Sequence, residues 1–129
     1  MIMNRKLNIL GTEYSFVLID KQDEYMKNNG LSGYVNYLLK RIVIWTKPIG
    51  EDLSLNVIES NFIIKHEIIH AFLYESGLPS EVCNFHTEDC VEFFTKQFSK
   101  ILEVVEEGTR ALLNESVGMD NEEIQSDHQ

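Results

Sequence analysis

The chain has 129 residues, of which 43% are hydrophobic and 25% are charged, and its formal net charge at pH 7 is −10. This length and composition are those of one globular domain with a single core, and they exclude a chain that is disordered throughout. The acidic charge argues against a nucleic-acid partner bound through a basic surface. The chain has no apolar run near the roughly 20 residues of a membrane helix, and the charged and polar residues of its start do not form the apolar core of a signal peptide. We therefore expect a cytoplasmic protein with no signal peptide and no membrane partner.

The first part of the chain predicts a small sheet. Residues 6–20 alternate loosely between apolar and polar side chains on both sides of Gly11, which predicts the two strands of a hairpin. Residues 20–33 are polar and contain an Asn-Asn-Gly turn signal, so a short helix or turn followed by a loop is expected. The run Arg41–Trp45 is rich in β-branched residues and predicts a further strand.

The second part predicts two helices. From Leu53 the apolar residues follow a helical period until Gly77, which Pro79 follows, as is typical of a helix C-terminus. A second helix is expected from about Thr87 to Leu113, with a possible break at a glycine. Its apolar residues recur at spacings of three and four, so we expect one stripe of the helix to pack against the rest of the domain. The stripe comprises Val91, Phe94, Phe98, Ile101 and Val105.

We divide the chain into a domain of residues 1–113 and a tail of residues 114–129. The tail holds five acidic residues and neither Lys nor Arg, so we expect it to be disordered and solvated, with an acidic decoy for a basic partner as the alternative. The predicted fold class of the domain is α+β, with a small β-sheet packed on the first of the two helices and the second, long helix beside it.

The first predicted helix carries the sequence His66-Glu67-Ile68-Ile69-His70. Residues four apart lie about 40° apart around a helix, so the two imidazoles can point at one ion. Glu67 lies one step round the helix, where its carboxylate can reach a water molecule on that ion, as in the HExxH zinc hydrolases. We expect this face, which includes Phe62, to lie against the core. Two histidines that merely pack or hydrogen-bond there are the simpler alternative.

A catalytic zinc site needs a third protein ligand and an open position. Glu88 and Glu92 lie four apart beside the apolar stripe of the second helix, so packing of that stripe would carry both carboxylates inward. The pattern is similar to that of gluzincins, where such a helix supplies a glutamate ligand and, four residues later, an acid that orients a ligand histidine. We take Glu88 as the ligand and Glu92 as the orienting acid, against the alternative of two solvated glutamates. His86 is a rival ligand or an oxyanion donor, and Cys83, His86 and Cys90 could form a separate structural site.

Three segments resemble small zincin-like metallopeptidases encoded in phages and prophages of low-GC Gram-positive bacteria, which are relatives of the ImmA/IrrE and SprT-like groups. The segments are HEIIHAFLYESGL (66–78), KLNILGTEY (6–14) and GYVNYLLKRIVI (33–44). The family's E-x-x-V-D/E segment matches residues 88–92, whereas its Cys-Asp pair after Gly-Tyr is replaced here by Val35-Asn36. The resemblance extends from residue 6 to about residue 102, and it implies a zincin-like fold and a bacterial host cell.

We interpret the chain as a metallopeptidase that hydrolyses a peptide or protein substrate, with Zn²⁺ held by His66, His70 and Glu88 and with Glu67 as the general base. The alternative is a non-catalytic zincin-fold protein that binds or regulates a host protein. A structural zinc protein with no open coordination position is the third hypothesis.

Two details of the peptidase hypothesis depend on the fold. Tyr34, Tyr37 and His86 are all open as donors to the oxyanion, and the sequence does not rank them. By analogy with zincins, the strand that ends at Trp45 is a candidate shelf on which an extended substrate could add as a further strand.

Overall fold

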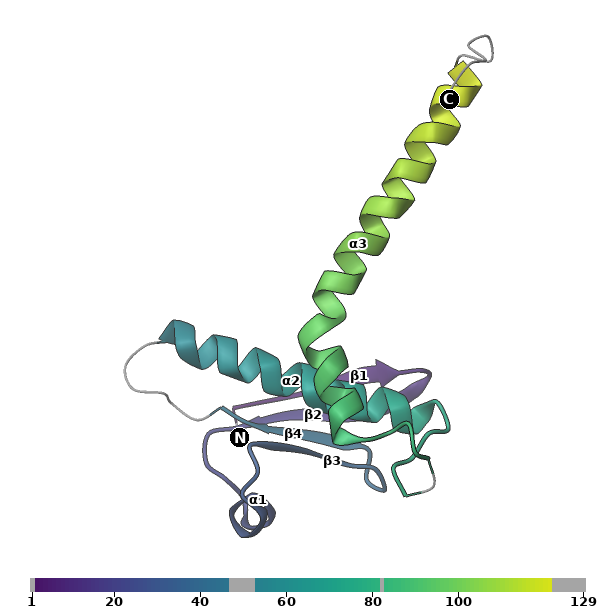
Figure 1. Ribbon diagram of the computed structural model, residues 1–129. Coiled ribbons are helices and arrows are strands. Elements are labelled where there is room, and N and C mark those ends of the chain that lie inside the picture. Colours follow the sequence, from purple (N-terminus) through teal and green to yellow (C-terminus); the bar gives the residue numbers. More distant parts are fainter. Residues whose placement is uncertain (1, 47–52, 82, 122–129) are drawn as a thin grey trace. The chain divides into compact units, whose positions relative to one another are not determined.

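The computed structural model describes residues 2–46, 53–81 and 83–121, and it describes side-chain burial for residues 2–46, 59–81 and 83–114. The chain divides into two compact units, residues 1–96 and residues 97–129, which are described separately below. The elements in chain order are β1 (Met3–Ile9), β2 (Thr12–Ile19), α1 (Glu24–Asn29), β3 (Gly33–Asn36), β4 (Arg41–Trp45), α2 (Leu53–Glu75) and α3 (Glu88–Asn121) (Figure 1).

The strands form one mixed sheet in the order β1-β2-β4-β3. The predicted hairpin is β1 paired antiparallel with β2, and the predicted strand Arg41–Trp45 is β4, which pairs parallel with β2. β3 pairs antiparallel with the other side of β4. Because β4 is paired on both sides, the expectation that the strand ending at Trp45 offers a free edge is wrong. The edge strand on this side of the sheet is β3.

β3 is the strand that the sequence did not predict. Residues 37–40 form the turn between β3 and β4, and they contain neither Gly nor Pro nor any other strong turn signal. Instead Lys40 takes the left-handed conformation, with φ of 54°, and Leu38 is 90% exposed at the turn. A left-handed lysine and an exposed leucine are uncommon in a turn. The turn former is Asn36 directly before it, whose Oδ1 accepts a hydrogen bond from the amide of Leu39 at 3.0 Å.

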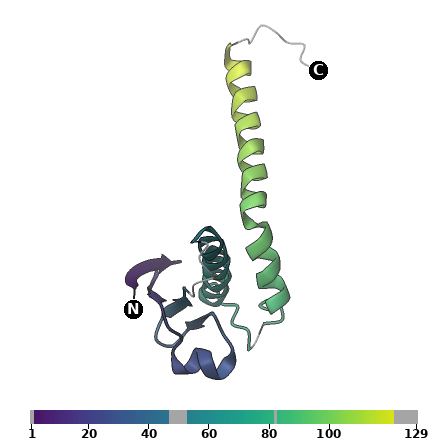
Figure 2. The ribbon, with the colours of Figure 1, turned by 90° about the vertical axis from the view of Figure 1, so that its left-hand side faces the viewer.

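α2 lies along one face of the sheet, in contact with β1, β3 and β4 (Figures 1 and 2). The close approach of α2 to β3 depends on Gly33, because a Cβ atom there would lie 2.8 Å from Cγ2 of Ile63. Fully burying one large apolar side chain contributes roughly 1.5–3 kcal/mol, so this interface is the main source of stability in the first unit. The buried core consists of Ile9, Tyr14, Phe16, Ile42, Ile44 and Ala71.

The C-terminus of α2 is fixed by its cap and by one carboxylate. Gly77 has φ of 84°, and the amide of Leu78 donates to the carbonyl of Leu73 at 3.0 Å, which confirms the predicted helix stop. Glu75 accepts hydrogen bonds from Tyr14 Oη at 2.6 Å, from Thr12 Oγ1 and from Lys40 Nζ. The hydrogen bond from Lys40, followed by the one from Tyr14, lowers the pKa of Glu75. The end of α2 is thereby tied to β2 and to the β3–β4 turn.

α3 begins close to its predicted start, where Thr87 Oγ1 accepts a hydrogen bond from the amide of Cys90 at 3.1 Å. The helix continues without a break at Gly108 and runs past the predicted end at Leu113 to Asn121. Residues 114–121 of the expected disordered tail are therefore helical, and residues 122–129 lie outside the described residues. The two compact units divide at residues 96 and 97, within α3, and not at residue 113.

The predicted α+β class is confirmed. The predicted packing of the α3 stripe holds only in part. Val91 is fully buried in the first unit, whereas Phe98, Ile101 and Val105 of the second unit are 52%, 43% and 56% exposed. Among the described residues, no helix has the length and apolar character that crossing a membrane requires.

Candidate metal centre

Three side chains of the first unit converge where the middle of α2 meets the first turn of α3. His66 and His70 come from α2 and Glu88 from α3, and one ligand atom of each lies within 4.8 Å of the other two. Nε2 of His70 lies 2.9 Å from Oε1 of Glu88, Nε2 of His66 lies 3.2 Å from Oε2 of Glu88, and the two Nε2 atoms are 3.3 Å apart. These three residues could hold a metal ion.

The size of this triangle can be compared with that of a tetrahedral zinc site. Zinc binds imidazole nitrogen and carboxylate oxygen at about 2.0–2.2 Å, so two ligand atoms at tetrahedral angles lie roughly 3.3–3.5 Å apart. The two Nε2 atoms are 3.3 Å apart, which is close to that value, and each faces a different oxygen of Glu88, His70 at 2.9 Å from Oε1 and His66 at 3.2 Å from Oε2. A calcium site would need more oxygen ligands at longer distances, and two imidazoles are poor ligands for it. The donor set and its spacing therefore fit a small transition-metal ion.

His86 lies behind His70 and not in the group that could hold the metal. Its side chain is buried, and its two ring nitrogens each have a partner at 2.7 Å, Nδ1 with the carbonyl oxygen of Leu78 and Nε2 with Nδ1 of His70. Neither nitrogen is left for a metal ion or for a substrate oxygen. The rival roles of His86 as a ligand or an oxyanion donor thus do not fit the geometry.

The hydrogen atoms along this row of contacts can be counted. The row runs from the carbonyl oxygen of Leu78 through His86 and His70 to Glu88 and contains three short contacts. Each contact needs one hydrogen or one bridging cation, and two imidazoles with one N–H each supply two hydrogens. Burial lowers the pKa of His70 to about 4, which disfavours a second N–H on that ring. A metal ion in the last contact, between His70 and Glu88, would complete the row.

The carbonyl of Leu78 can only accept a hydrogen bond, so Nδ1 of His86 donates to it. With one N–H on each ring, Nε2 of His86 then accepts from Nδ1 of His70. Nε2 of His70 then presents a lone pair to Glu88 Oε1 at 2.9 Å. Two acceptors at that distance repel each other unless a cation lies between them, and this is the position that a metal ion would take.

Glu92 lies behind the other histidine. Its Oε1 is 3.2 Å from Nδ1 of His66, and its Oε2 is 3.6 Å from Nζ of Lys96. An N–H on Nδ1 of His66 would donate to this carboxylate and leave Nε2 as the free ligand atom. Both Glu88 and Glu92 contact histidines, but the expectation that both carboxylates are carried inward is wrong for Glu88, whose side chain is 71% exposed, while that of Glu92 is 39% exposed.

Glu67 is buried beside the triangle, with 8% of its surface exposed. Burial, and after it the charge of Glu88, raises the pKa of Glu67 from its ordinary value of 4.5 to about 8. The Cγ atom of Glu67 lies 3.1 Å from the position that a Cβ on Gly33 would take, so the edge strand and the carboxylate are packed together. A strongly shifted carboxyl group beside a ligand triangle is typical of a catalytic site.

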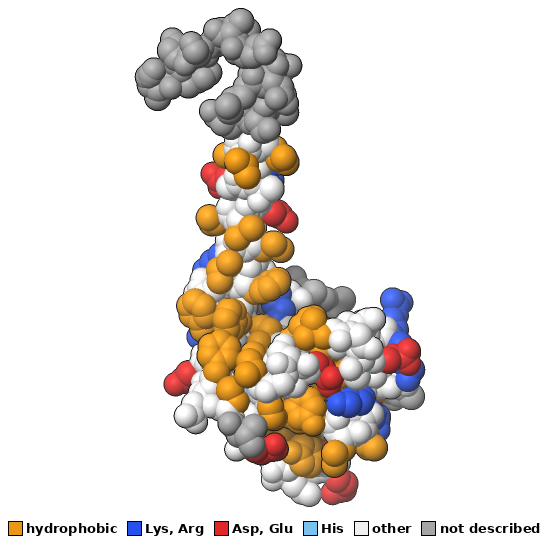
Figure 3. All heavy atoms as spheres, turned by 90° about the vertical axis from the view of Figure 1, so that its right-hand side faces the viewer, with side chains coloured by type: hydrophobic (Ala, Val, Ile, Leu, Met, Phe, Trp, Pro, Cys, Tyr) orange, Lys and Arg blue, Asp and Glu red, His pale blue; other side chains and the backbone are white. Residues whose placement is uncertain are grey.

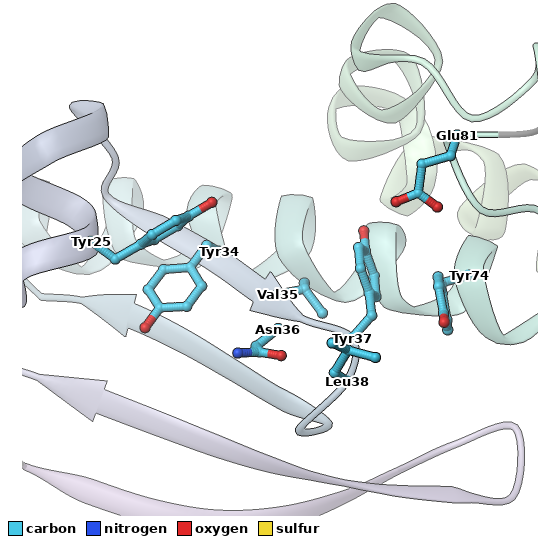
Figure 4. Close-up of a pocket in the computed structure, with 8 residues that line it drawn as sticks. All are labelled: Tyr25, Tyr34, Val35, Asn36, Tyr37, Leu38, Tyr74 and Glu81. Atoms are coloured by element: carbon cyan, nitrogen blue, oxygen red, sulfur yellow. The ribbon is translucent and has the colours of Figure 1, made fainter.

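A hollow of about 550 Å³ runs along β3 and is partly lined by Tyr37, Tyr74 and Glu81 (Figure 4). Tyr37 stacks on Tyr74, with the ring centroids 4.3 Å apart and the planes at 11°. Burial, and after it the charges of Glu67, Glu88 and Glu81, raises the pKa of Tyr37 above its ordinary value. The charges of Glu67 and Glu88 thus reach this phenol, while His66 and Glu67 themselves line a separate hollow of about 220 Å³ beside Gly33.

The other tyrosine that the sequence singled out has a different partner. Tyr34 donates a hydrogen bond from its hydroxyl to Oδ2 of Asp23 at 2.7 Å, and burial together with this contact raises the pKa of Tyr34 to about 12. Of the three candidate oxyanion donors, Tyr37 is thus the one whose hydroxyl makes no hydrogen bond to another described residue and whose pKa is raised by the charges of Glu67 and Glu88.

No protein-family model, curated protein or solved structure matches this chain. The site is therefore characterised by its geometry alone.

One further expectation is wrong, because Phe62 is 37% exposed. The α2 side chains of the core are Ala71, which is buried, and Ile63, Ile64 and Ile68, which pack against it. The two histidines contact Glu88 at the start of α3.

The separate structural site also lacks support. Cys83 and Cys90 are free thiols, and within the described residues they do not join any group of potential metal ligands. Cys83 instead accepts a hydrogen bond on its Sγ from the amide of Phe85. With His86 engaged by His70, the three residues have no common ligand position.

Proposed function

We propose that the protein is a zinc-dependent peptidase whose metal ion is held by His66, His70 and Glu88. The observation that carries the proposal is the convergence of two imidazoles and one carboxylate, whose ligand atoms lie within 4.8 Å of one another. This donor set is one that zinc commonly takes in catalytic sites. The resemblance of HEIIH to the zinc hydrolase motif supports hydrolysis.

The side chains around the triangle have distinct tasks in this proposal. Zinc would supply a Lewis acid that lowers the pKa of a water molecule towards 7. Glu67 takes the proton of the attacking water and returns it to the leaving amine. Tyr37 donates a hydrogen bond from its hydroxyl to the carbonyl oxygen as negative charge develops there. Glu92 and His86 hold His66 and His70 in the ring orientations that present Nε2 of each to the ion.

The substrate in this proposal is an extended peptide. β3 is a sheet edge, so its free backbone groups can pair with a further strand, and the hollow along it can accept side chains. Gly33 brings this edge against the packed stem of Glu67. A peptide paired with β3 would therefore pass beside the general base.

Two measurements test the proposal. The first is the zinc content of the purified protein, with the expectation of one zinc ion per chain and its loss in His66→Ala and Glu88→Ala. The second is cleavage of a fluorogenic peptide library by Glu67→Gln, which we expect to bind zinc and to lose turnover by roughly 10²–10⁴-fold. Glu106→Gln, an exposed change of the same type on α3, is the matched control and should behave as the wild type.

Two results would contradict the proposal. A wild-type protein that stays free of metal after zinc is supplied would remove the metal site. Full turnover by Glu67→Gln would exclude this residue as the base, and a zinc-loaded protein that cleaves no library member would favour the non-catalytic binding function.

A further inference from the structure

The second unit carries an apolar face that is independent of the metal centre. Between residues 97 and 114, α3 exposes every large apolar side chain to solvent, and Figure 3 shows hydrophobic side chains following the length of the helix. We call this surface the apolar face of α3. It consists of Phe98 (52% exposed), Ile101 (43%), Leu102 (45%), Val104 (67%), Val105 (56%), Leu112 (69%) and Leu113 (57%).

The charged side chains of the same stretch keep to the other side. With 100° per residue, they fall within an arc of about 120°, and the apolar face occupies roughly the opposite half of the helix. The stretch holds two basic and three acidic residues and so has a net charge of −1, although the whole chain has −10. The charged residues are Lys100, Glu103, Glu106, Glu107 and Arg110.

The helix also needs a partner for its own stability. Residues 97–114 include a glycine, a threonine and several β-branched apolar residues, which are weak helix formers. In proteins most of the stability of a helix comes from packing of its apolar face and not from helix propensity. An apolar surface about 24 Å long, at 1.5 Å per residue, would otherwise stay in contact with water.

We propose that the apolar face of α3 is a self-association surface whose occupant is the same face of a second copy of this chain. A partner must present an uncharged apolar surface of matching length, and the face itself is such a surface. Phe98, Ile101, Val105 and Leu112 occupy positions of the alternating three- and four-residue repeat by which two helices pack side by side, and Gly108 takes the one position between Val105 and Leu112. A symmetric pair places this patch against itself, as two-fold interfaces do.

Charge favours the same partner. A chain of net charge −10 resists self-association where its acidic groups meet, but the charged side of this stretch points away from the apolar face and is nearly balanced. Pairing therefore does not bring like charges together within residues 97–114. A strongly basic or acidic partner would find no countercharge on this face.

The test is the molar mass of the full chain in solution, measured by light scattering from about 1 to 100 μM. We expect twice the 15.0 kDa of one chain at the upper end. Val105→Lys puts a charge at the centre of the face and should raise the dissociation constant of the dimer by at least about 100-fold. Glu103→Lys, which places the same residue on the charged side, is the matched control and should leave the dimer intact.

A monomeric wild-type protein over this range would overturn the proposal and leave the face to another protein or to the chain's own first unit. A dimer that persists in Val105→Lys would overturn it too, since the contact would then lie elsewhere. Emission from Trp45, the only tryptophan, reports whether the sheet remains folded. If Val105→Lys alters that emission, Leu112→Lys on the same face decides between the two results.

Discussion

His86→Phe tests whether the buried histidine orients a metal ligand. Phenylalanine fills a similar volume but has no ring nitrogen, so two contacts of 2.7 Å are lost, one to the carbonyl of Leu78 and one to Nδ1 of His70. A neutral buried hydrogen bond contributes about 1 kcal/mol, and a buried group left without a partner costs about 1–3 kcal/mol. We therefore expect the metal-free protein to lose roughly 2–4 kcal/mol of its free energy of unfolding.

The effect on the metal is measured separately. Without His86, nothing holds the N–H of His70 on Nδ1, so Nε2 is no longer kept free as the ligand atom. Losing such an orienting partner weakens metal binding about 10–100-fold, which corresponds to about 1.4–2.7 kcal/mol. Competition with a chromophoric chelator gives the zinc affinity, and urea unfolding in the presence of a chelator gives the stability of the metal-free protein.

His86→Gln is the control, because its amide can both donate and accept in the same space. We expect it to recover most of the zinc affinity that His86→Phe loses. If His86→Phe remains folded and binds zinc as tightly as the wild type, the row of contacts does not position His70 and the reasoning fails. If both variants lose the same affinity, the ring shape matters and the hydrogen bonds do not.

Three further predictions concern other parts of the first unit. Gly33→Ala should lower the free energy of unfolding by about 1–3 kcal/mol in urea titrations, because its Cβ would meet Cγ2 of Ile63 at 2.8 Å; an unchanged midpoint would show that β3 can shift freely. Glu75→Gln should cost about 2 kcal/mol at pH 7. Because the pKa of Glu75 is lowered in the folded state, that difference should vanish as the pH falls through this pKa, and a constant difference would contradict the assignment. Glu92→Ala should weaken zinc binding about 10-fold, because Nδ1 of His66 loses its carboxylate partner. A zinc affinity equal to that of the wild type would show that Glu92 does not orient His66.

Much of the fold follows from local patterns. The hairpin around Gly11, the strand Arg41–Trp45 and the stop of α2 at Gly77 each carry a strong signal in residue type or period, and all three are present. β3 lacked such a signal, because its turn uses a left-handed Lys40 and not a glycine. The length of α3 was underestimated, since Gly108 lowers helix propensity without preventing a helix.

Residue spacing predicted the part of the candidate site that lies on the two helices. The interval of four in HEIIH and in Glu88–Glu92 placed four side chains on two helix faces, and the structure brings those faces together. The task of His86 could not be predicted, because it depends on the carbonyl of Leu78, which has no signature in the sequence. Tyr37 could not be ranked above Tyr34 because the sequence does not show that Asp23 binds the latter.

The ligand triangle draws on two helices that are separated by a loop, since Glu88 lies 18 residues after His70. An ion that binds only the folded chain stabilises it by an amount that grows with the concentration of free ion, about 2.7 kcal/mol at 100 times the dissociation constant. Binding of the ion would then hold the first turn of α3 against α2, and the stabilising free energy would grow with the concentration of free zinc. The folded population of this protein would thus depend on zinc availability in its surroundings.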